Sequence, residues 1–273
     1  MARLAGTCLR VRLGDLKNHW ALVTGASSGI GREFACQLAA AGVNLVLVAR
    51  RLDPLKVLAT ELRKQYDVDI LDLPMDLAQP DAARELHARL QADGIRIRLL
   101  VNNAALGHWA PFEAGSCAAY EAMIGVNVMA VVELCHVFQH DLAAHPDSAI
   151  INVSSPAAYQ PIPTMAVYAA SKSFVHSFSQ ALHGEWGKNG VLVQTLLPGP
   201  TATALPGAQA GVRHGGVGKP MPVGEPVRAS LRHLERGTAV VITARGTIWQ
   251  RIFALLPAEI VIRLVGRMFA PDR

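Results

Sequence analysis

The sequence contains few of the residues that build disulfide-rich or metal-binding proteins. Only four cysteines occur among its 273 residues, widely separated at Cys8, Cys36, Cys117 and Cys135. Their spacing matches neither a disulfide framework nor a metal-binding cluster, and the ten histidines are equally scattered. We therefore predict no metal site and, because unpaired thiols suit a reducing compartment, a cytoplasmic location.

Long apolar runs and clusters of basic residues are also missing. No run of eighteen apolar residues occurs, so the sequence predicts no membrane-spanning helix. The N-terminal arginines flank an apolar stretch that is too interrupted for a signal peptide. The net charge of +5 comes from dispersed residues, and no nucleic-acid-binding motif accompanies it. This argues against a nucleic-acid partner and favours a basic surface that attracts an anionic cofactor.

Apolar residues make up 51% of the chain and recur in a regular alternation. Stretches typical of amphipathic helices separate seven strand-like runs, at residues 20–24, 44–49, 69–73, 98–102, 149–154, 191–196 and 239–243. Buried strands separated by helices predict an α/β fold, a doubly wound parallel sheet with helices on both faces. We expect one domain over 19–247, an N-terminal extension (1–18) and a C-terminal tail (248–273).

A glycine-rich segment, TGASSGIG at 24–31, follows the first strand-like run and precedes a helix-like pattern. Gly25 permits a tight turn, Gly29 lets the backbone approach a ligand, and Gly31 allows close helix packing. The N-terminus of the following helix presents free N–H groups to an anion, so this context predicts a pyrophosphate-binding turn. A glycine loop without a function is the alternative.

A second motif joins Tyr168 and Lys172, which lie four residues apart and so on one face of a predicted helix. An ammonium there lowers the phenol pKa from its usual value of about 10, which makes tyrosine a usable acid or base. Ser155, thirteen residues upstream, supplies a hydroxyl that can donate to a carbonyl oxygen. Together the three groups predict proton transfer to or from such an oxygen; separately, each has an ordinary structural explanation.

From about residue 20 to about residue 244 the chain resembles the classical short-chain dehydrogenase/reductase (SDR) family. The matching elements occur in family order and at family-like spacings: TGASSGIG at 24–31, Asp76-Leu77, Asn102-Asn103-Ala104-Ala105, Asn127, Ser155, Tyr168, Lys172 and Pro198-Gly199. Ala105 stands where the family has glycine. The resemblance implies a Rossmann-type sheet of seven strands in the order 3-2-1-4-5-6-7, a nicotinamide cofactor, and assembly as a homodimer or homotetramer.

The resemblance also implies roles for four polar side chains. Tyr168 would be the general acid in reduction and the base in oxidation, assisted by Lys172, which would also hydrogen-bond the nicotinamide ribose. Ser155 would donate to the substrate oxygen, and Asn127 would hold a water that links Lys172 to solvent. The predicted function is an oxidoreductase that reduces a ketone or oxidises a secondary alcohol. A dinucleotide-binding sensor or scaffold with little turnover is the alternative.

The residues after the second strand indicate which cofactor binds. An acidic residue here would bind a ribose 2′-hydroxyl, whereas Arg50 and Arg51 stand in its place. They favour NADP(H) over NAD(H), unless they merely solvate a strand end. The other residues expected at the cofactor are Gly25, Ser27, Ser28, Gly29, Ile30 and Gly31 at the phosphates, Asp76, Leu77, Asn103 and Ala104 at the adenosine, and Pro198, Gly199, Thr201 and Thr203 at the nicotinamide.

Apolar residues surround the expected position of the substrate. The segments 106–112 and 156–167 contain Trp109, Tyr159 and Met165 but no arginine or lysine that could bind an anionic group. This favours a largely apolar ketone or alcohol, unless these side chains simply belong to the core. A segment rich in glycine and proline, at about 200–226, is typical of a mobile lid over a ligand.

The C-terminal stretch 248–269 alternates apolar residues with Arg251, Arg263 and Arg267. This pattern is typical of a basic amphipathic helix, which could contact a membrane surface. The alternatives are packing on the protein itself or on a partner subunit.

Overall fold

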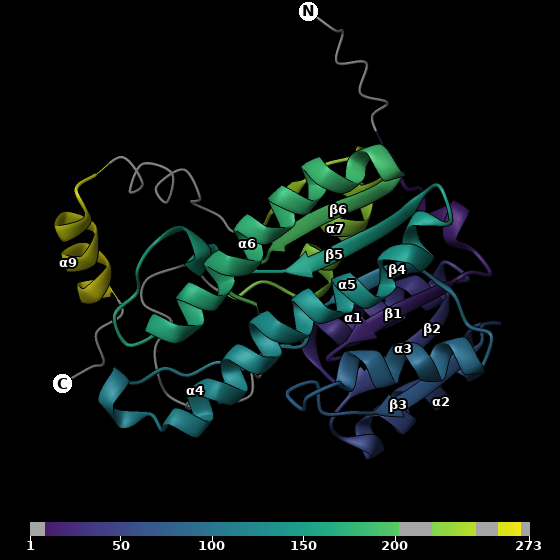
Figure 1. The fold of residues 1–273 in the computed structure, drawn as a ribbon, viewed down its shortest axis with the longest axis horizontal. Helices are drawn as coiled ribbons and strands as arrows, with labels where there is room; N and C mark the ends of the chain where they lie inside the picture. The colour runs from purple at the N-terminus through teal and green to yellow at the C-terminus, as the bar shows by residue number, and fades with distance from the viewer. Residues whose placement is uncertain (1–8, 202–219, 244–255, 269–273) are drawn as a thin grey trace, which may run out of the picture.

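The computed structural model describes residues 9–201, 220–243 and 256–268 and has an α/β architecture (Figure 1). Its seven-stranded sheet has the order β3-β2-β1-β4-β5-β6-β7, and all neighbouring strands are parallel. Helices cover both faces of the sheet. The predicted doubly wound sheet and its strand order are therefore confirmed.

The strands are short, and those at the centre of the sheet are almost wholly buried. Their bounds are β1 (Trp20–Thr24), β2 (Asn44–Ala49), β3 (Ile70–Pro74), β4 (Ile97–Asn102), β5 (Ser148–Val153), β6 (Val191–Leu197) and β7 (Val240–Ile242). Every residue of β5 and β6 is buried. A parallel sheet covered on two faces requires such apolar strands, which is why the strands were recognisable as continuous runs in the sequence.

The α-helices of the described chain pack on the sheet in two groups, apart from α4 and α9. Their bounds are α1 (Gly29–Ala40), α2 (Leu52–Gln65), α3 (Ala82–Ala92), α4 (Cys117–Ile124), α5 (Ala130–Ala143), α6 (Ala166–Trp186), α7 (Gly224–Leu234) and α9 (Ala258–Met268). The connections contain the short turns η1 (Leu13–Leu16), η2 (Phe112–Ala114), η3 (Gly125–Met129), η4 (Pro156–Tyr159) and η5 (Gly187–Asn189). Helices α1, α2 and α7 cover one face, and α3, α5 and α6 cover the other.

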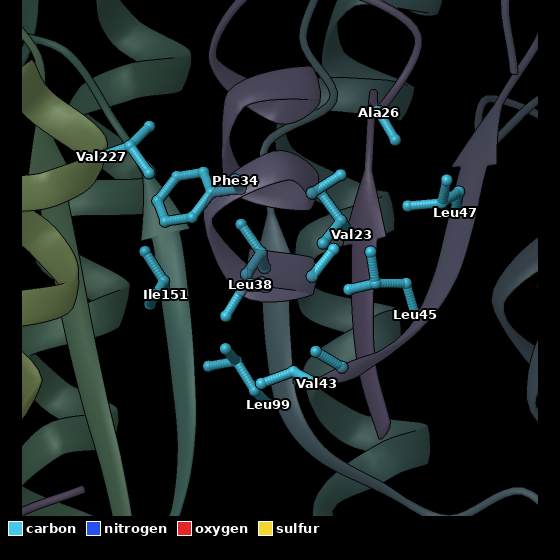
Figure 2. Packing of buried hydrophobic residues seen from close by; sticks show 14 of the residues in the cluster. Val23, Ala26, Phe34, Leu38, Val43, Leu45, Leu47, Leu99, Ile151 and Val227 are labelled. Atoms are coloured by element: carbon cyan, nitrogen blue, oxygen red, sulfur yellow. The ribbon is translucent and has the colours of Figure 1, made fainter. Parts of the chain in front are cut away.

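Helix α1 is fixed to the sheet by two fully buried side chains, Phe34 and Leu38 (Figure 2). They lie among Val23 of β1, Ile151 of β5 and Val227 of α7, within one apolar cluster. Burying each such side chain contributes about 1.5–3 kcal/mol. The packing matters for function because the first residues of α1 belong to the glycine-rich segment.

Helix α4, the turn η3 and α5 form one continuous helical stretch, Cys117–Ala143. Among the described residues it alone has the length and composition of a membrane span, with a mean hydropathy of 1.5, and 44% of its most apolar window is buried in the protein. Its Leu134, Phe138 and Leu142 pack in the cluster that joins α3, α5 and α6 to the sheet. The contacts identify the stretch as a core helix.

Candidate active site

The glycine-rich segment forms a tight turn between β1 and α1. Gly25 and Gly29 have φ angles of +65° and +56°, in the left-handed region that other residues rarely adopt. A Cβ on Gly31 would lie 2.3 Å from the carbonyl oxygen of Gly25, so no side chain fits there. The Ser28 side chain makes no capping hydrogen bond, which leaves N–H groups at the start of α1 for an anion. The turn therefore fits a pyrophosphate.

Thr24, at the end of β1, connects this turn to the end of β4. Its Oγ1 donates to the Val101 carbonyl (3.2 Å) and accepts from the N–H groups of Asn103 (2.9 Å) and Ala104 (3.0 Å). The side-chain Nδ2 of Asn103 in turn donates to the Thr24 carbonyl (2.9 Å). These bonds join two strand ends where the strand order reverses, which is the place where open α/β sheets bind ligands. The sequence pattern did not indicate this role of Thr24; a hydroxyl directly before the glycine turn was the available signal.

Tyr168 and Lys172 lie one turn apart at the N-terminal end of α6. Lys172 Nζ lies 5.8 Å from the centroid of the Tyr168 ring and donates to the Val153 carbonyl at the end of β5 (3.0 Å). The Tyr168 side chain is hydrogen-bonded to Ser155. The neighbouring Ser154 instead donates to the Lys172 carbonyl (2.7 Å). The structure thus brings Tyr168, Lys172 and Ser155 together, and the hydrogen bond from Ser154 joins the end of β5 to α6.

Burial governs the ionisation of these groups, because Tyr168 and Lys172 are only 9% and 3% exposed. Burial raises the pKa of Tyr168, and the hydrogen bond with Ser155 opposes this rise. Burial also lowers the pKa of Lys172 to about 8. The expected lowering of the tyrosine pKa is not found, because desolvation of the phenolate is the larger effect.

Asn127 lies in the π-helical turn η3, between α4 and α5, and is 1% exposed. Its Oδ1 accepts from the Leu106 N–H (2.8 Å), and its Nδ2 donates to the Leu106 carbonyl (2.9 Å) and to Ser171 Oγ (3.0 Å). Ser171 precedes Lys172, so the amide ties the loop after β4 to the helix that carries Tyr168. A π-helical turn within a longer helix frequently marks a functional site. This bridging contact was not predicted.

Arg50 and Arg51 are exposed directly after β2. The Val48 carbonyl near the end of this strand accepts from the Ala26 N–H (3.2 Å), which places the arginines' strand beside the glycine turn. The backbone positions of Arg50 and Arg51 are therefore on the side of the site where we predict the phosphates to lie.

The remaining residues predicted on the cofactor side serve partly structural roles. Asp76 Oδ1 accepts from the Ala78 N–H (3.1 Å), just after β3, and Leu77 is buried in the core. Ile30 is partly buried and packs against the apolar cluster that contains Phe34 and Leu38. Ser27 lies in the glycine turn itself.

After β6, Pro198 and Gly199 lead into Thr201, whose hydroxyl donates to the Gly199 carbonyl (2.7 Å). Thr201 also forms a bridge with Met221, whose N–H donates to the Pro200 carbonyl (2.8 Å). Thr203 and most of the expected lid lie outside the described residues. Helix α7 begins at Gly224, inside the segment that was expected to be a loop.

Two of the three predicted pocket residues lie beside Tyr168. The Trp109 ring is 5.5 Å from the Tyr168 ring, tilted by 34°, and Met165 is buried in the same apolar cluster. Tyr159 instead contacts the His176 ring at 5.0 Å, about two helical turns beyond Tyr168 on α6. The same cluster contains Val261 and Val265 of α9, whose position next to the site could not be read from the sequence.

The sequence matches the short chain dehydrogenase family over residues 19–210, and the chain belongs to this family. It is 31% identical to the very-long-chain 3-oxoacyl-CoA reductase of Homo sapiens over 224 residues, which covers 81% of this chain and 70% of that protein. For the corresponding bovine and duck (Anas platyrhynchos) proteins the match spans 62% and 64% of their length.

Solved structures are similar over most of both chains. A short-chain dehydrogenase from Sphingobium yanoikuyae, in complex with NADPH, is 32% identical with a TM-score of 0.77, covering 86% of this chain and 92% of that one. The bulky-bulky ketone specific alcohol dehydrogenase from Comamonas testosteroni is 32% identical with a TM-score of 0.74, covering 86% and 90%. The fold, the glycine turn and the family membership together define an oxidoreductase of the short-chain dehydrogenase type.

Proposed function

We propose that the protein is an NADP(H)-dependent oxidoreductase that reduces a ketone, or oxidises the corresponding secondary alcohol, on a largely apolar molecule. The juxtaposition of Tyr168, Ser155 and Lys172, at the same edge of the sheet as the glycine turn, carries this proposal. The residues fit a dinucleotide because Gly25 and Gly29 form a tight turn with positive φ angles, and the start of α1 is not capped by a side chain.

The bound nicotinamide would supply or accept the hydride, and the protein would move the proton. In reduction, the Ser155 hydroxyl donates a hydrogen bond to the substrate carbonyl oxygen, and Tyr168 transfers its phenolic proton to that oxygen. The ammonium of Lys172, 5.8 Å from the ring centroid, stabilises the phenolate that remains. In oxidation the phenolate removes the proton from the substrate hydroxyl. The proposed water relay through Asn127 would then exchange protons with solvent.

The choice of NADP(H) is supported by Arg50 and Arg51, which are exposed at the strand end beside the glycine turn. A guanidinium pairs well with a 2′-phosphate, and no acidic side chain stands at these two positions to bind a 2′-hydroxyl. The similar structure from Sphingobium yanoikuyae holds NADPH, in agreement with this choice.

An apolar substrate is supported by the apolar side chains that pack in the cluster around Tyr168, among them Ile162 and Met165. Two similar proteins are named for their substrates, one as a very-long-chain 3-oxoacyl-CoA reductase and one as a bulky-bulky ketone specific alcohol dehydrogenase. We therefore propose a carbonyl group flanked by an acyl chain or a bulky ring system.

Titration of the protein with NADPH and NADH, followed by assays against a panel of apolar ketones, tests the proposal. Tighter binding of NADPH with turnover of at least one ketone is expected. Tighter binding of NADH would contradict the role of Arg50 and Arg51. Binding without turnover, in either direction, would support the alternative of a dinucleotide sensor or scaffold.

A homo-oligomer is supported by exposed apolar side chains on helices that pack together. Ile124, Met129 and Phe174 are 45%, 49% and 41% exposed, the first two on or just after α4 and the third on α6. Large apolar side chains of this kind are typical of a surface that a second subunit covers. Sedimentation of the wild type and of a Phe174→Glu variant tests this: a wild-type monomer would contradict it.

Peripheral contact with a membrane, in an otherwise cytoplasmic protein, is supported by the outer side of α9. Ile260 and Leu264 are 45% and 39% exposed there, next to the exposed Arg263 and Arg267. Such a helix suits an anionic lipid surface. Co-sedimentation with vesicles that contain phosphatidylserine is the test, and a protein that stays in the supernatant would contradict the contact.

A further inference from the structure

Ser171 occupies a buried position in α6 between Tyr168 and Lys172, and it is only 4% exposed. Its Oγ donates a hydrogen bond to the Tyr168 carbonyl (2.7 Å) and accepts one from Asn127 Nδ2 (3.0 Å). A serine hydroxyl within a helix commonly bonds a carbonyl three or four residues before it. The second bond comes from another helical segment and is not required for α6 to form. This second bond points to a role of Ser171 outside its own helix.

The side chain of Asn127 connects Ser171 to the loop after β4. Its Oδ1 accepts from the Leu106 N–H (2.8 Å), and its Nδ2 donates both to the Leu106 carbonyl (2.9 Å) and to Ser171 Oγ. Both Nδ2 hydrogens thus have an acceptor, and a flipped amide would place Nδ2 against the Leu106 N–H. Because buried hydrogen bonds in a chain polarise one another, the hydroxyl of Ser171 strengthens this orientation of Asn127.

These bonds and one ring contact form a closed circuit around Tyr168. Trp109 lies three residues beyond Leu106 on the same loop, and its ring is 5.5 Å from the Tyr168 ring. The loop therefore contacts the side chain of Tyr168, whereas Ser171 bonds its main-chain carbonyl. Since Asn127 joins this loop to Ser171, the restraints on the ring and on the main chain of Tyr168 are connected through one hydroxyl.

We infer that Ser171 is a positioning residue for proton transfer: by bonding both the Tyr168 carbonyl and the Asn127 amide, it sets the place of the phenol relative to the loop after β4. The inference rests on the proposed function and adds to it a residue that acts through Tyr168 and Asn127. The phenol must lie within hydrogen-bonding reach of the substrate oxygen, and a displacement of about 1 Å can lower the rate about a hundredfold. The same hydroxyl keeps Asn127 in place for the proposed proton relay.

The test compares Ser171→Ala with Ser179→Ala in the full chain. Ser179 lies about two turns further along α6, is 1% exposed, donates to the Val175 carbonyl (2.6 Å) and accepts from Asn152 Nδ2 (2.9 Å). Each substitution therefore removes a buried hydroxyl with the same pair of bonds, but Ser179 ties α6 to β5 rather than to Asn127.

The two variants are assayed with NADPH and a ketone that the wild type reduces. Ser171→Ala is expected to lower kcat about tenfold or more, with KM and the Kd of NADPH changed less than about threefold, because geometry rather than binding is affected. Ser179→Ala is expected to keep the kcat of the wild type. An equal loss of kcat in both variants, or a wild-type kcat in Ser171→Ala, would overturn the inference. If Ser171→Ala does not fold, Ser171→Cys replaces it with the same expectation, because a thiol is a weak donor and acceptor.

A double-mutant cycle shows whether Ser171 acts through Asn127. The combined Asn127→Ala/Ser171→Ala variant is expected to lose less kcat than the product of the two single losses, because either substitution alone breaks the chain of hydrogen bonds. A loss equal to that product would show that the two side chains act independently, which would overturn the inference.

Hydrogen exchange of the Leu106 amide separates failure of the inference from failure of the proposed function, because it needs no turnover. Ser171→Ala is expected to speed this exchange about tenfold or more, since the Asn127 side chain that accepts from this N–H loses a buried hydrogen bond. Ser179→Ala is expected to leave it unchanged. If the wild type reduces no ketone, the proposed function fails, and faster exchange in Ser171→Ala alone still supports the positioning role. Equal exchange in the wild type and Ser171→Ala would overturn that role whatever the activity.

Discussion

At the glycine turn, the positions that matter are defined by the backbone: Gly25 and Gly29 have positive φ angles, and Gly31 lies too close to the Gly25 carbonyl for any side chain. At the substrate end, which is distant from the glycine turn in the sequence, side chains from four separate segments meet around Tyr168. The first region involves consecutive residues, and the second depends on long-range packing. A change at the turn should therefore affect every dinucleotide-dependent step, whereas a change in the cluster should affect substrates selectively.

Replacement of Tyr168 by Phe should have the largest effect, because it removes the proton donor at the centre of the substrate end. Turnover is expected to fall by about 10²- to 10⁴-fold, with NADPH affinity nearly unchanged. Steady-state kinetics and a fluorescence titration of NADPH check the two parts. Retained turnover would contradict the role of Tyr168, and lost NADPH binding would mean that the two regions are not independent.

A Gly31→Ala variant should distort the glycine turn. The added methyl group would lie 2.3 Å from the Gly25 carbonyl oxygen, so the turn must shift. We expect weaker NADPH binding, by about tenfold or more, and a free energy of unfolding lower by about 1–3 kcal/mol. Calorimetric NADPH titration and urea unfolding measure both quantities.

Gly184→Ala is the matched control for this substitution. A Cβ at this exposed position in α6 meets nothing within 4 Å. Because alanine is the better helix former, the control should stabilise the protein by about 0.5–1 kcal/mol without an effect on NADPH. Equal NADPH affinity of the two variants would show that the turn does not contact the cofactor.

An Arg50→Ala variant should separate the contact with the 2′-phosphate from the other cofactor contacts at the glycine turn. Loss of one charge-assisted contact is expected to weaken NADPH binding about tenfold or more and to leave NADH binding within about twofold. Arg89→Ala, in the last turn of α3, removes the same charge from an exposed position and serves as the control. Parallel losses for NADPH and NADH would contradict a 2′-phosphate contact.

The pH dependence of the free energy of unfolding should report on the ionisation of Lys172. The folded protein releases this proton at about pH 8, whereas an unfolded lysine holds it to 10.5. Between these values the unfolded chain binds more protons, so the free energy of unfolding rises with pH. We expect a rise of roughly 1–2 kcal/mol from pH 8 to pH 9.5. Above about pH 10, the raised pKa of Tyr168 reverses the slope.

Urea unfolding of the cofactor-free protein at several pH values measures this dependence. A Lys172→Met variant removes the titrating group and is expected to flatten the curve between pH 8 and pH 9.5. A wild-type curve without a rise would indicate that Lys172 is more accessible to water than its burial suggests.

The sequence by itself determined the strands, the glycine turn and the spacing of Ser155, Tyr168 and Lys172, whereas the strand order followed from the resemblance to the family. These features depend on local requirements: buried strands must be apolar, positive φ angles require glycine, and a spacing of four places two side chains on one face of a helix. Ser155 was selected by its spacing from Tyr168, and the neighbouring Ser154 bonds the Lys172 carbonyl.

Only the tertiary structure decided which distant segments meet. Thr24 joins the ends of β1 and β4, Asn127 joins Leu106 to Ser171, and α9 packs Val261 and Val265 against the segment around Met165. It also reversed the expected direction of the Tyr168 pKa, because burial depends on every element packed around a group. Contacts of this kind arise between residues that are far apart in the chain, where no periodicity or spacing relates one to the other.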